Sequence, residues 1–245
     1  MIKLYCTNTE TLIDSRNKAI WDEVTTKYDL SIQLYNGREY RHQLFQGKAV
    51  ILVPELNNSI ELFTHELLHI YIRTKRLFIT EYLLQRLKAE PLLYWSLTDN
   101  LFEQVGHYLE HLHILPIYLT CGFDRSNFFE DYELQPCSSL NIQLLYRGMK
   151  KTPPSMAIID LYINKFFAMK ASLNASSNYN GYLEDLKEMN PALFSILDRF
   201  WKRWTGIDIN SLHTTGSPYK KFTAEFVHEL GNWTVKNIYA SKRIA

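Results

Sequence analysis

The sequence predicts an α+β fold, in which a small N-terminal mixed α/β sheet layer packs on one central helix and a mainly helical C-terminal half follows. Before residue 54, helical and strand patterns alternate, whereas after it the apolar residues recur almost everywhere at helical spacing. The 245 residues are enough for a substantial core, and the 46% hydrophobic and 22% charged content is typical of globular proteins. Disordered and fibrous classes are therefore excluded.

The first third of the chain contains one predicted helix and two predicted strands. Residues 11–28 carry apolar side chains at helical spacing, and residues 30–35 alternate apolar and polar side chains as a half-buried strand does. Asn36 and Gly37 indicate a turn. Residues 49–53 form a β-branched apolar run that Pro54 stops, which is typical of a buried strand.

The next predicted helix is apolar on nearly every side. We expect Asn58 to cap its N-terminus with Glu61 completing a capping box, and basic residues gather near position 75, where the helix dipole favours cations. Three polar residues interrupt this helix: His65, Glu66 and His69.

The rest of the chain reads as helices at 81–87, 99–115, 155–172, 191–204 and 222–239, with the second ending at Pro116 and a loop at 174–181. Asn190 is the expected N-cap of the helix at 191–204, and Gly206 its expected end. The segment 150–155 combines two lysines with two prolines and is the best internal boundary. We therefore divide the chain into a catalytic region, 1–149, and a helical C-terminal region, 150–245, packed together as one compact unit.

Charge and cysteine usage exclude several partners. With 27 Lys plus Arg against 26 Asp plus Glu, no whole-chain field attracts nucleic acid or an anionic membrane. The N-terminus has no secretory signal pattern and no segment is apolar enough to span a bilayer, so we expect a cytoplasmic protein. Cys6, Cys121 and Cys137 are odd in number and lack metal-site spacing, which favours reduced thiols.

The polar residues of the central helix have the spacing of a catalytic metal site. His65 and His69 are four residues apart and therefore project about 40° apart on one helical face, where both imidazoles can bind one ion. Glu66 lies at the side of that face and can act as general base on a water that the ion activates. Two histidines, a glutamate as third ligand and one position left open for water favour one Zn²⁺ per chain, with Fe²⁺ as the nearest competitor.

The segment His65-Glu66-Leu67-Leu68-His69 resembles the H-E-x-x-H motif of the zincins, zinc metallopeptidases in which an N-terminal sheet backs the motif helix. The resemblance is specific over residues 49–71 and weaker over 100–123. It implies a zincin-like catalytic region and hydrolysis of a peptide bond. A metzincin would have Gly at 72 and His at 75, but the chain has Ile72 and Lys75, so the resemblance is to the gluzincin branch.

In that branch the third ligand comes from a downstream helix, and Glu103 lies on the next long one. This helix is similar to the E-x-x-A-[DN] helix of the zinc peptidases that cleave phage repressors and stress-response regulators. In this match, Glu103 corresponds to the metal-binding Glu of the motif and Gly106 to its small residue. His107 stands at the position where that family has Asp or Asn. Because His107 departs from the pattern, His107, Glu110 and His111 remain alternative ligands or outer-sphere partners.

Two further roles stay open. A residue that stabilises the oxyanion is expected, and six side chains are chemically able to do so: Tyr71, Tyr108, Tyr118, His213, Tyr219 and His228. An extended peptide or protein substrate is expected along a sheet edge beside the strand at 49–53. The leading hypothesis is thus a zinc metallopeptidase with Glu66 as general base; the alternatives are a catalytically silent binding or regulatory module and a zinc hydrolase of a non-peptide amide.

Overall fold

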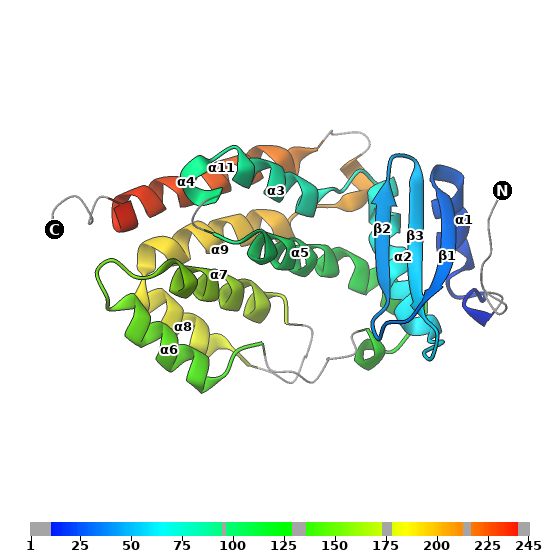
Figure 1. The fold of residues 1–245 in the computed structure, drawn as a ribbon, viewed down its shortest axis with the longest axis horizontal. Coiled ribbons are helices and arrows are strands. Elements are labelled where there is room, and N and C mark those ends of the chain that lie inside the picture. Colours follow the sequence, from blue (N-terminus) through cyan, green and yellow to red (C-terminus); the bar gives the residue numbers. More distant parts are fainter. Residues whose placement is uncertain (1–10, 95–96, 129–135, 173–177, 213–216, 240–245) are drawn as a thin grey trace. The chain divides into compact units, whose positions relative to one another are not determined.

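A computed structural model of the chain describes residues 11–94, 97–128, 136–172, 178–212 and 217–239. The fold is α+β, as predicted, with one three-stranded sheet among the described residues and helices elsewhere (Figure 1). The chain forms two compact units. Unit 1 comprises Met1–Leu77, Leu112–Tyr132 and Ile209–His213, and unit 2 comprises Phe78–His111, Glu133–Asp208 and Thr214–Ala245.

The sheet of unit 1 has the order β1-β3-β2. Strand β1 (Asp29–Tyr35) pairs with β3 (Lys48–Pro54) in parallel, with Ile32 opposite Ile51, and β2 (Arg41–Phe45) pairs with β3 in antiparallel, with His42 opposite Ile51. The strands β1 and β3 confirm the predictions for 30–35 and 49–53. Strand β2 was not predicted, because its short sequence RHQLF has only two apolar residues.

Two helices cover one face of this sheet (Figure 1). Helix α1 (Lys18–Lys27) packs on α2 (Ile60–Thr74), and α2 contacts both β2 and β3. The covered face carries the buried side chains of Leu30, Ile32, Ala49, Ile51 and Val53. On β2, His42 and Leu44 are half-buried while Arg41, Gln43 and Phe45 are exposed, so the strand turns His42 toward α2.

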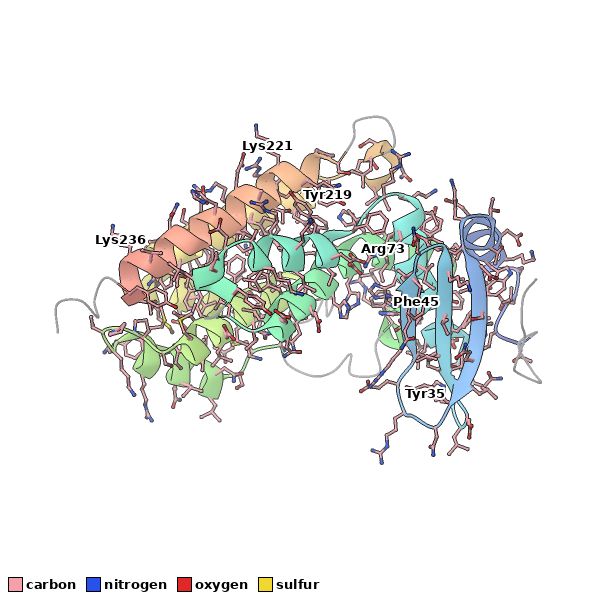
Figure 2. The ribbon with its side chains drawn as sticks, turned by 45° about the horizontal axis from the view of Figure 1, so that its top comes forward. Tyr35, Phe45, Arg73, Tyr219, Lys221 and Lys236 are labelled. Atoms are coloured by element: carbon pink, nitrogen blue, oxygen red, sulfur yellow. The ribbon has the colours of Figure 1, made fainter. Side chains whose placement is uncertain are left out.

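Helix α2 begins one residue later than predicted. Its N-cap is Ser59, whose hydroxyl accepts a hydrogen bond from the Leu62 backbone N–H, so the expected cap at Asn58 was wrong. At the other end, the buried Arg73 donates to the Leu77 carbonyl at 2.8 Å, which satisfies a carbonyl just beyond the helix (Figure 2). Both ends of the motif helix are thus anchored by side-chain hydrogen bonds.

Unit 2 is a helical array around an aromatic core. Its helices are α3 (Ile79–Lys88), α4 (Pro91–Tyr94), the first part of α5, α6 (Ser139–Met149), α7 (Met156–Lys170), α8 (Asn180–Met189), α9 (Pro191–Thr205) and α11 (Pro218–Thr234), which continues into a π-helical turn at Val235–Tyr239. Phe167 on α7, Phe200 on α9 and Phe226 on α11 are buried, and their rings contact one another. The predicted caps of α9 are confirmed, because the Asn190 side chain accepts from Leu193 N–H and Gly206 is the C-cap.

Helix α5 (Asp99–Thr120) belongs to both units, because its residues up to His111 are part of unit 2 and those from Leu112 are part of unit 1. The prediction that it ends before Pro116 was wrong. Proline removes one helical hydrogen bond, but the buried Ile114, Leu115 and Tyr118 on both sides of it offset that loss by packing. The helix ends instead before Gly122, whose positive φ of 85° suits a residue without a side chain.

The C-terminal half was predicted less completely. Helices α6 and α8 were not foreseen, and the loop expected at 174–181 overlaps the start of α8, while residues 173–177 lie outside the described part. Short 3₁₀ turns at Arg125–Asn127 and Ile209–Ser211 complete unit 1. The segment 150–155 connects α6 with α7 inside unit 2, and the predicted division into a catalytic region and a helical region stays a prediction.

No helix in the described ranges is both long and apolar enough to cross a bilayer. Cys121 and Cys137 are free thiols, and Cys6 lies outside the described residues.

Candidate metal centre

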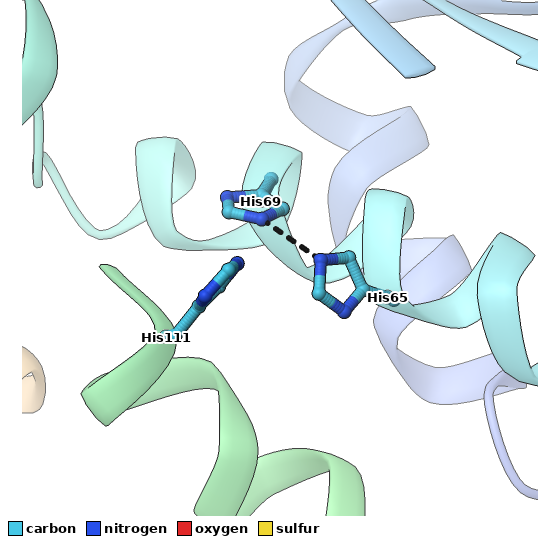
Figure 3. A group of neighbouring side chains, drawn as sticks. All are labelled: His65, His69 and His111. Carbon is cyan, nitrogen blue, oxygen red and sulfur yellow. Dashed lines mark hydrogen bonds between the residues drawn. The ribbon is translucent and has the colours of Figure 1, made fainter. Parts of the chain in front are cut away.

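Three buried imidazoles converge in the structure. His65 and His69 project from α2, and His111 projects from α5 (Figure 3). One nitrogen from each ring lies within 4.8 Å of the others, and none of the three residues is more than 8% exposed. Among the described residues, these three histidines are the group of potential metal ligands whose donor atoms lie this close together.

The spacing fits one zinc ion. The Nε2 atoms of His65 and His69 are 3.2 Å apart. Two nitrogens that each lie about 2.0–2.1 Å from a tetrahedral Zn²⁺ are about 3.3 Å apart, so the pair needs almost no movement to share an ion. The same distance suits a hydrogen bond between the two rings, which places the lone pair of one imidazole toward the other.

The environment keeps the imidazole of His65 neutral. Burial, with a smaller contribution from the neighbouring His69, lowers the pKa of His65 to about 3. A neutral imidazole has a lone pair to donate to a metal, whereas a protonated one has none. The ring of Phe128, buried and 4.4 Å from the His65 ring by centroids, contributes apolar surroundings on this side.

Glu66 lies beside the three imidazoles and is held by a residue that the sequence did not single out. Its Oε2 is 2.6 Å from Nδ1 of His42, and both side chains are largely buried. Burial alone raises the pKa of Glu66, but the hydrogen bond and charge of His42, with smaller contributions from His65 and His69, outweigh it and bring the pKa to about 2. Glu66 is therefore a carboxylate at neutral pH.

His42 also contacts a ligand candidate. Its ring stacks on His69, with centroids 4.9 Å apart and planes 15° from parallel. The signal in the sequence was weak: His42 and Leu44 alternate with polar residues as inward-facing positions of a strand do, but a five-residue strand with one apolar inward position is hard to recognise. Its proximity to Glu66 depends on the pairing of β2 with β3, which only the fold reveals.

The comparisons with known proteins found no match. No family model, no curated protein and no solved structure matches the chain.

Of the four predicted candidates on α5, the structure brings His111 to the pair on α2. Glu103 and His107 are exposed, and Glu103 precedes His111 by eight residues, which is about 12 Å along a helix. Glu110 is fully buried, but Oγ1 of Thr80, at the start of α3, donates to it at 2.6 Å. The geometry therefore favours His111, one of the alternatives, over the leading candidate Glu103.

Gly106, which the resemblance matches to a small residue, is required here by the packing of α5 against α3. A Cβ added there would lie 2.2 Å from Oγ1 of Thr80 and 2.9 Å from its backbone Cα. The missing side chain lets α3 approach α5 closely and brings Thr80 to Glu110.

The candidates for stabilising an oxyanion have other contacts. The hydroxyl of the buried Tyr219 accepts from the Phe78 backbone N–H at the start of α3 (Figure 2), and His228 is exposed on α11 beside Asn232. Tyr118 is buried with its ring edge-on to Phe128. The Lys75 ammonium lies over the ring of Tyr71, Tyr108 is half-buried, and His213 lies outside the described residues.

Proposed function

We propose that this protein is a zinc-dependent metallopeptidase in which His65, His69 and His111 hold the metal and Glu66 is the general base. The observation that carries the proposal is the convergence of three buried imidazoles near a largely buried carboxylate that is hydrogen-bonded to His42. Three neutral histidines around an open fourth position are an established ligand set of catalytic zinc.

The set of nitrogen donors favours zinc over iron. Three imidazole nitrogens suit Zn²⁺, whereas a non-haem Fe²⁺ site characteristically has two histidines and one carboxylate. Glu66 follows His65 directly and is hydrogen-bonded to His42, which keeps its carboxylate for proton transfer.

The roles of the residues follow from their positions. A bound zinc ion supplies Lewis acidity, which lowers the pKa of a water and polarises a carbonyl oxygen. Glu66, ionised at neutral pH, accepts a proton at a carboxylate oxygen and returns it to the leaving amine. His42 keeps that carboxylate in one orientation, and the buried rings around His65 limit access of bulk water.

Strand β2 supports a peptide as substrate. Within the described part of the chain it pairs with β3 on one edge and has no strand partner on the other. A free strand edge offers backbone hydrogen bonds to an extended chain without regard to its sequence. Because His42 lies on this strand, a substrate paired along it passes beside Glu66.

Metal analysis and one isosteric variant test the proposal. The purified chain should hold about one zinc per molecule, and Glu66→Gln should keep that zinc while abolishing cleavage of a denatured-protein or peptide-library substrate. Glu229→Gln is the matched control, because Glu229 also follows a histidine but lies exposed on α11 in a salt bridge with Arg199.

Each alternative gives a different result. An unmutated chain without stoichiometric zinc contradicts the metal site. Bound zinc without Glu66-dependent cleavage favours the binding or regulatory module, and Glu66-dependent hydrolysis confined to small non-peptide amides favours the third hypothesis.

A further inference from the structure

The contact between His42 and Glu66 joins two elements with different tasks. His42 belongs to the edge strand β2, and Glu66 belongs to the motif helix α2. Nδ1 of His42 lies 2.6 Å from Oε2 of Glu66, within hydrogen-bond distance, and an imidazole N–H there donates to the carboxylate oxygen. A charge-assisted bond of this length between largely buried groups restricts the rotation of the carboxylate.

We propose that His42 is a positioning residue, which acts on the reaction by holding Glu66 in the orientation needed for proton transfer. The inference rests on the proposed function, since it assigns His42 a task toward the same base. It goes beyond that function because it gives strand β2 a role in orienting the general base, in addition to its role as a docking edge for the substrate.

The geometry distinguishes positioning from metal binding. His42 is not in the cluster of nitrogens formed by His65, His69 and His111, and its Nδ1 is already used by Glu66. Its ring does stack on His69, so a second role in orienting that ligand must be separated by experiment.

Two substitutions separate the hydrogen bond from the stacking. His42→Phe keeps an aromatic ring over His69 but removes the donor. His42→Asn removes the ring but carries an amide N–H close to the position of Nδ1. The measurement is the zinc content of each chain and, by calorimetry, its Kd for acetohydroxamate, a zinc chelator whose remaining N–H or O–H can bond to a carboxylate beside the metal.

The affinity for acetohydroxamate should fall when the hydrogen bond to Glu66 is lost and stay nearly unchanged when it is kept. We expect His42→Phe to weaken binding about 10-fold or more, as loss of an outer-sphere partner commonly does, with full zinc content, and His42→Asn to stay within about 3-fold of the unmutated chain. In a Glu66→Ala background, His42→Phe should have no further effect, because a positioning residue acts only through the group that it positions.

Three results overturn the inference: unchanged affinity in His42→Phe, equal losses in the two variants, or an undiminished loss in the Glu66→Ala background. Loss of zinc in His42→Phe would also overturn it, because it would make His42 a support for His69. Failure of the proposed function is recognised separately, since the unmutated chain would then lack zinc or bind acetohydroxamate equally well after Glu66→Gln.

Discussion

Unit 1 and unit 2 both bury polar side chains, but those around Glu66 in unit 1 contact one another, whereas those of Tyr219 and Trp204 in unit 2 bond to the backbone. In unit 1, His42 contacts both Glu66 and His69, and His69 contacts His65. In unit 2, the Tyr219 hydroxyl bonds to the backbone at the start of α3, and the Trp204 indole N–H donates to the Leu109 carbonyl at 3.0 Å. Burial of a polar group therefore does not by itself indicate a functional site.

Helix α5 shows this difference in two adjacent residues. Glu110 is fully buried and accepts a hydrogen bond from Thr80 at the start of α3. His111 is buried and lies close to the two histidines of α2. Both are chemically able to bind zinc, and their neighbours decide which of them is available. Variants of these two positions should therefore separate metal affinity from stability.

The largest expected effect is on metal affinity. His111→Ala should weaken zinc binding by at least about 100-fold, more than the loss of an outer-sphere partner costs, because one of three ligands is removed. Competition with a chromophoric chelator measures the change. Glu103→Ala, on the same helix, should leave affinity unchanged, because Glu103 is exposed and outside the cluster.

The opposite result would make Glu103, the leading candidate from the sequence, the third metal ligand. If Glu103→Ala releases zinc and His111→Ala does not, the third ligand is the carboxylate that the resemblance to the E-x-x-A-[DN] helix implies.

A smaller effect is expected on stability, at Glu110. Thr80→Val removes the hydroxyl that donates to this side chain, and the loss of one partner from a buried polar group costs about 1–3 kcal/mol. Urea unfolding measures the change, and Thr80→Ser, which keeps the hydroxyl, is the matched control. Zinc affinity of the folded protein should not change. A loss of affinity in Thr80→Val would show that Glu110 also acts on the metal site.

The sequence singled out the members of the candidate site that lie within one element. His65, Glu66 and His69 share a helix whose pattern is local, so their common face follows from helical periodicity alone. The third ligand could not be chosen in this way, because Glu103, His107, Glu110 and His111 lie on neighbouring rows of α5 and only the packing decides among them.

The fold was predictable to a similar degree. Strongly periodic segments such as β3, α2 and α9 were found nearly at their bounds. Strand β2, whose short polar sequence has no clear pattern of its own, depends on its pairing with β3, and His42 was missed with it. The extension of α5 beyond Pro116 was missed because packing overrides a local helix-breaking signal.

The smallest expected effect concerns an ion pair of unit 1 away from the site. Glu23 on α1 accepts from Lys75 Nζ at 2.6 Å and from Thr74 Oγ1 at 2.9 Å. Partial burial raises the pKa of Glu23, but these two partners outweigh it and lower the pKa below its usual value. The folded state therefore binds the proton less readily than the unfolded state. The resulting stabilisation is complete above pH 4.5 and is lost as the pH falls through the folded-state pKa.

Because the Glu23 side chain is 37% exposed, solvent screening limits this contribution to about 0.2–1 kcal/mol. Glu23→Gln should lower the free energy of unfolding by that amount at pH 7, and the difference from the unmutated chain should shrink toward pH 3. Urea titrations at both pH values measure it. A difference that grows on acidification would mean that the pair does not hold Glu23 ionised.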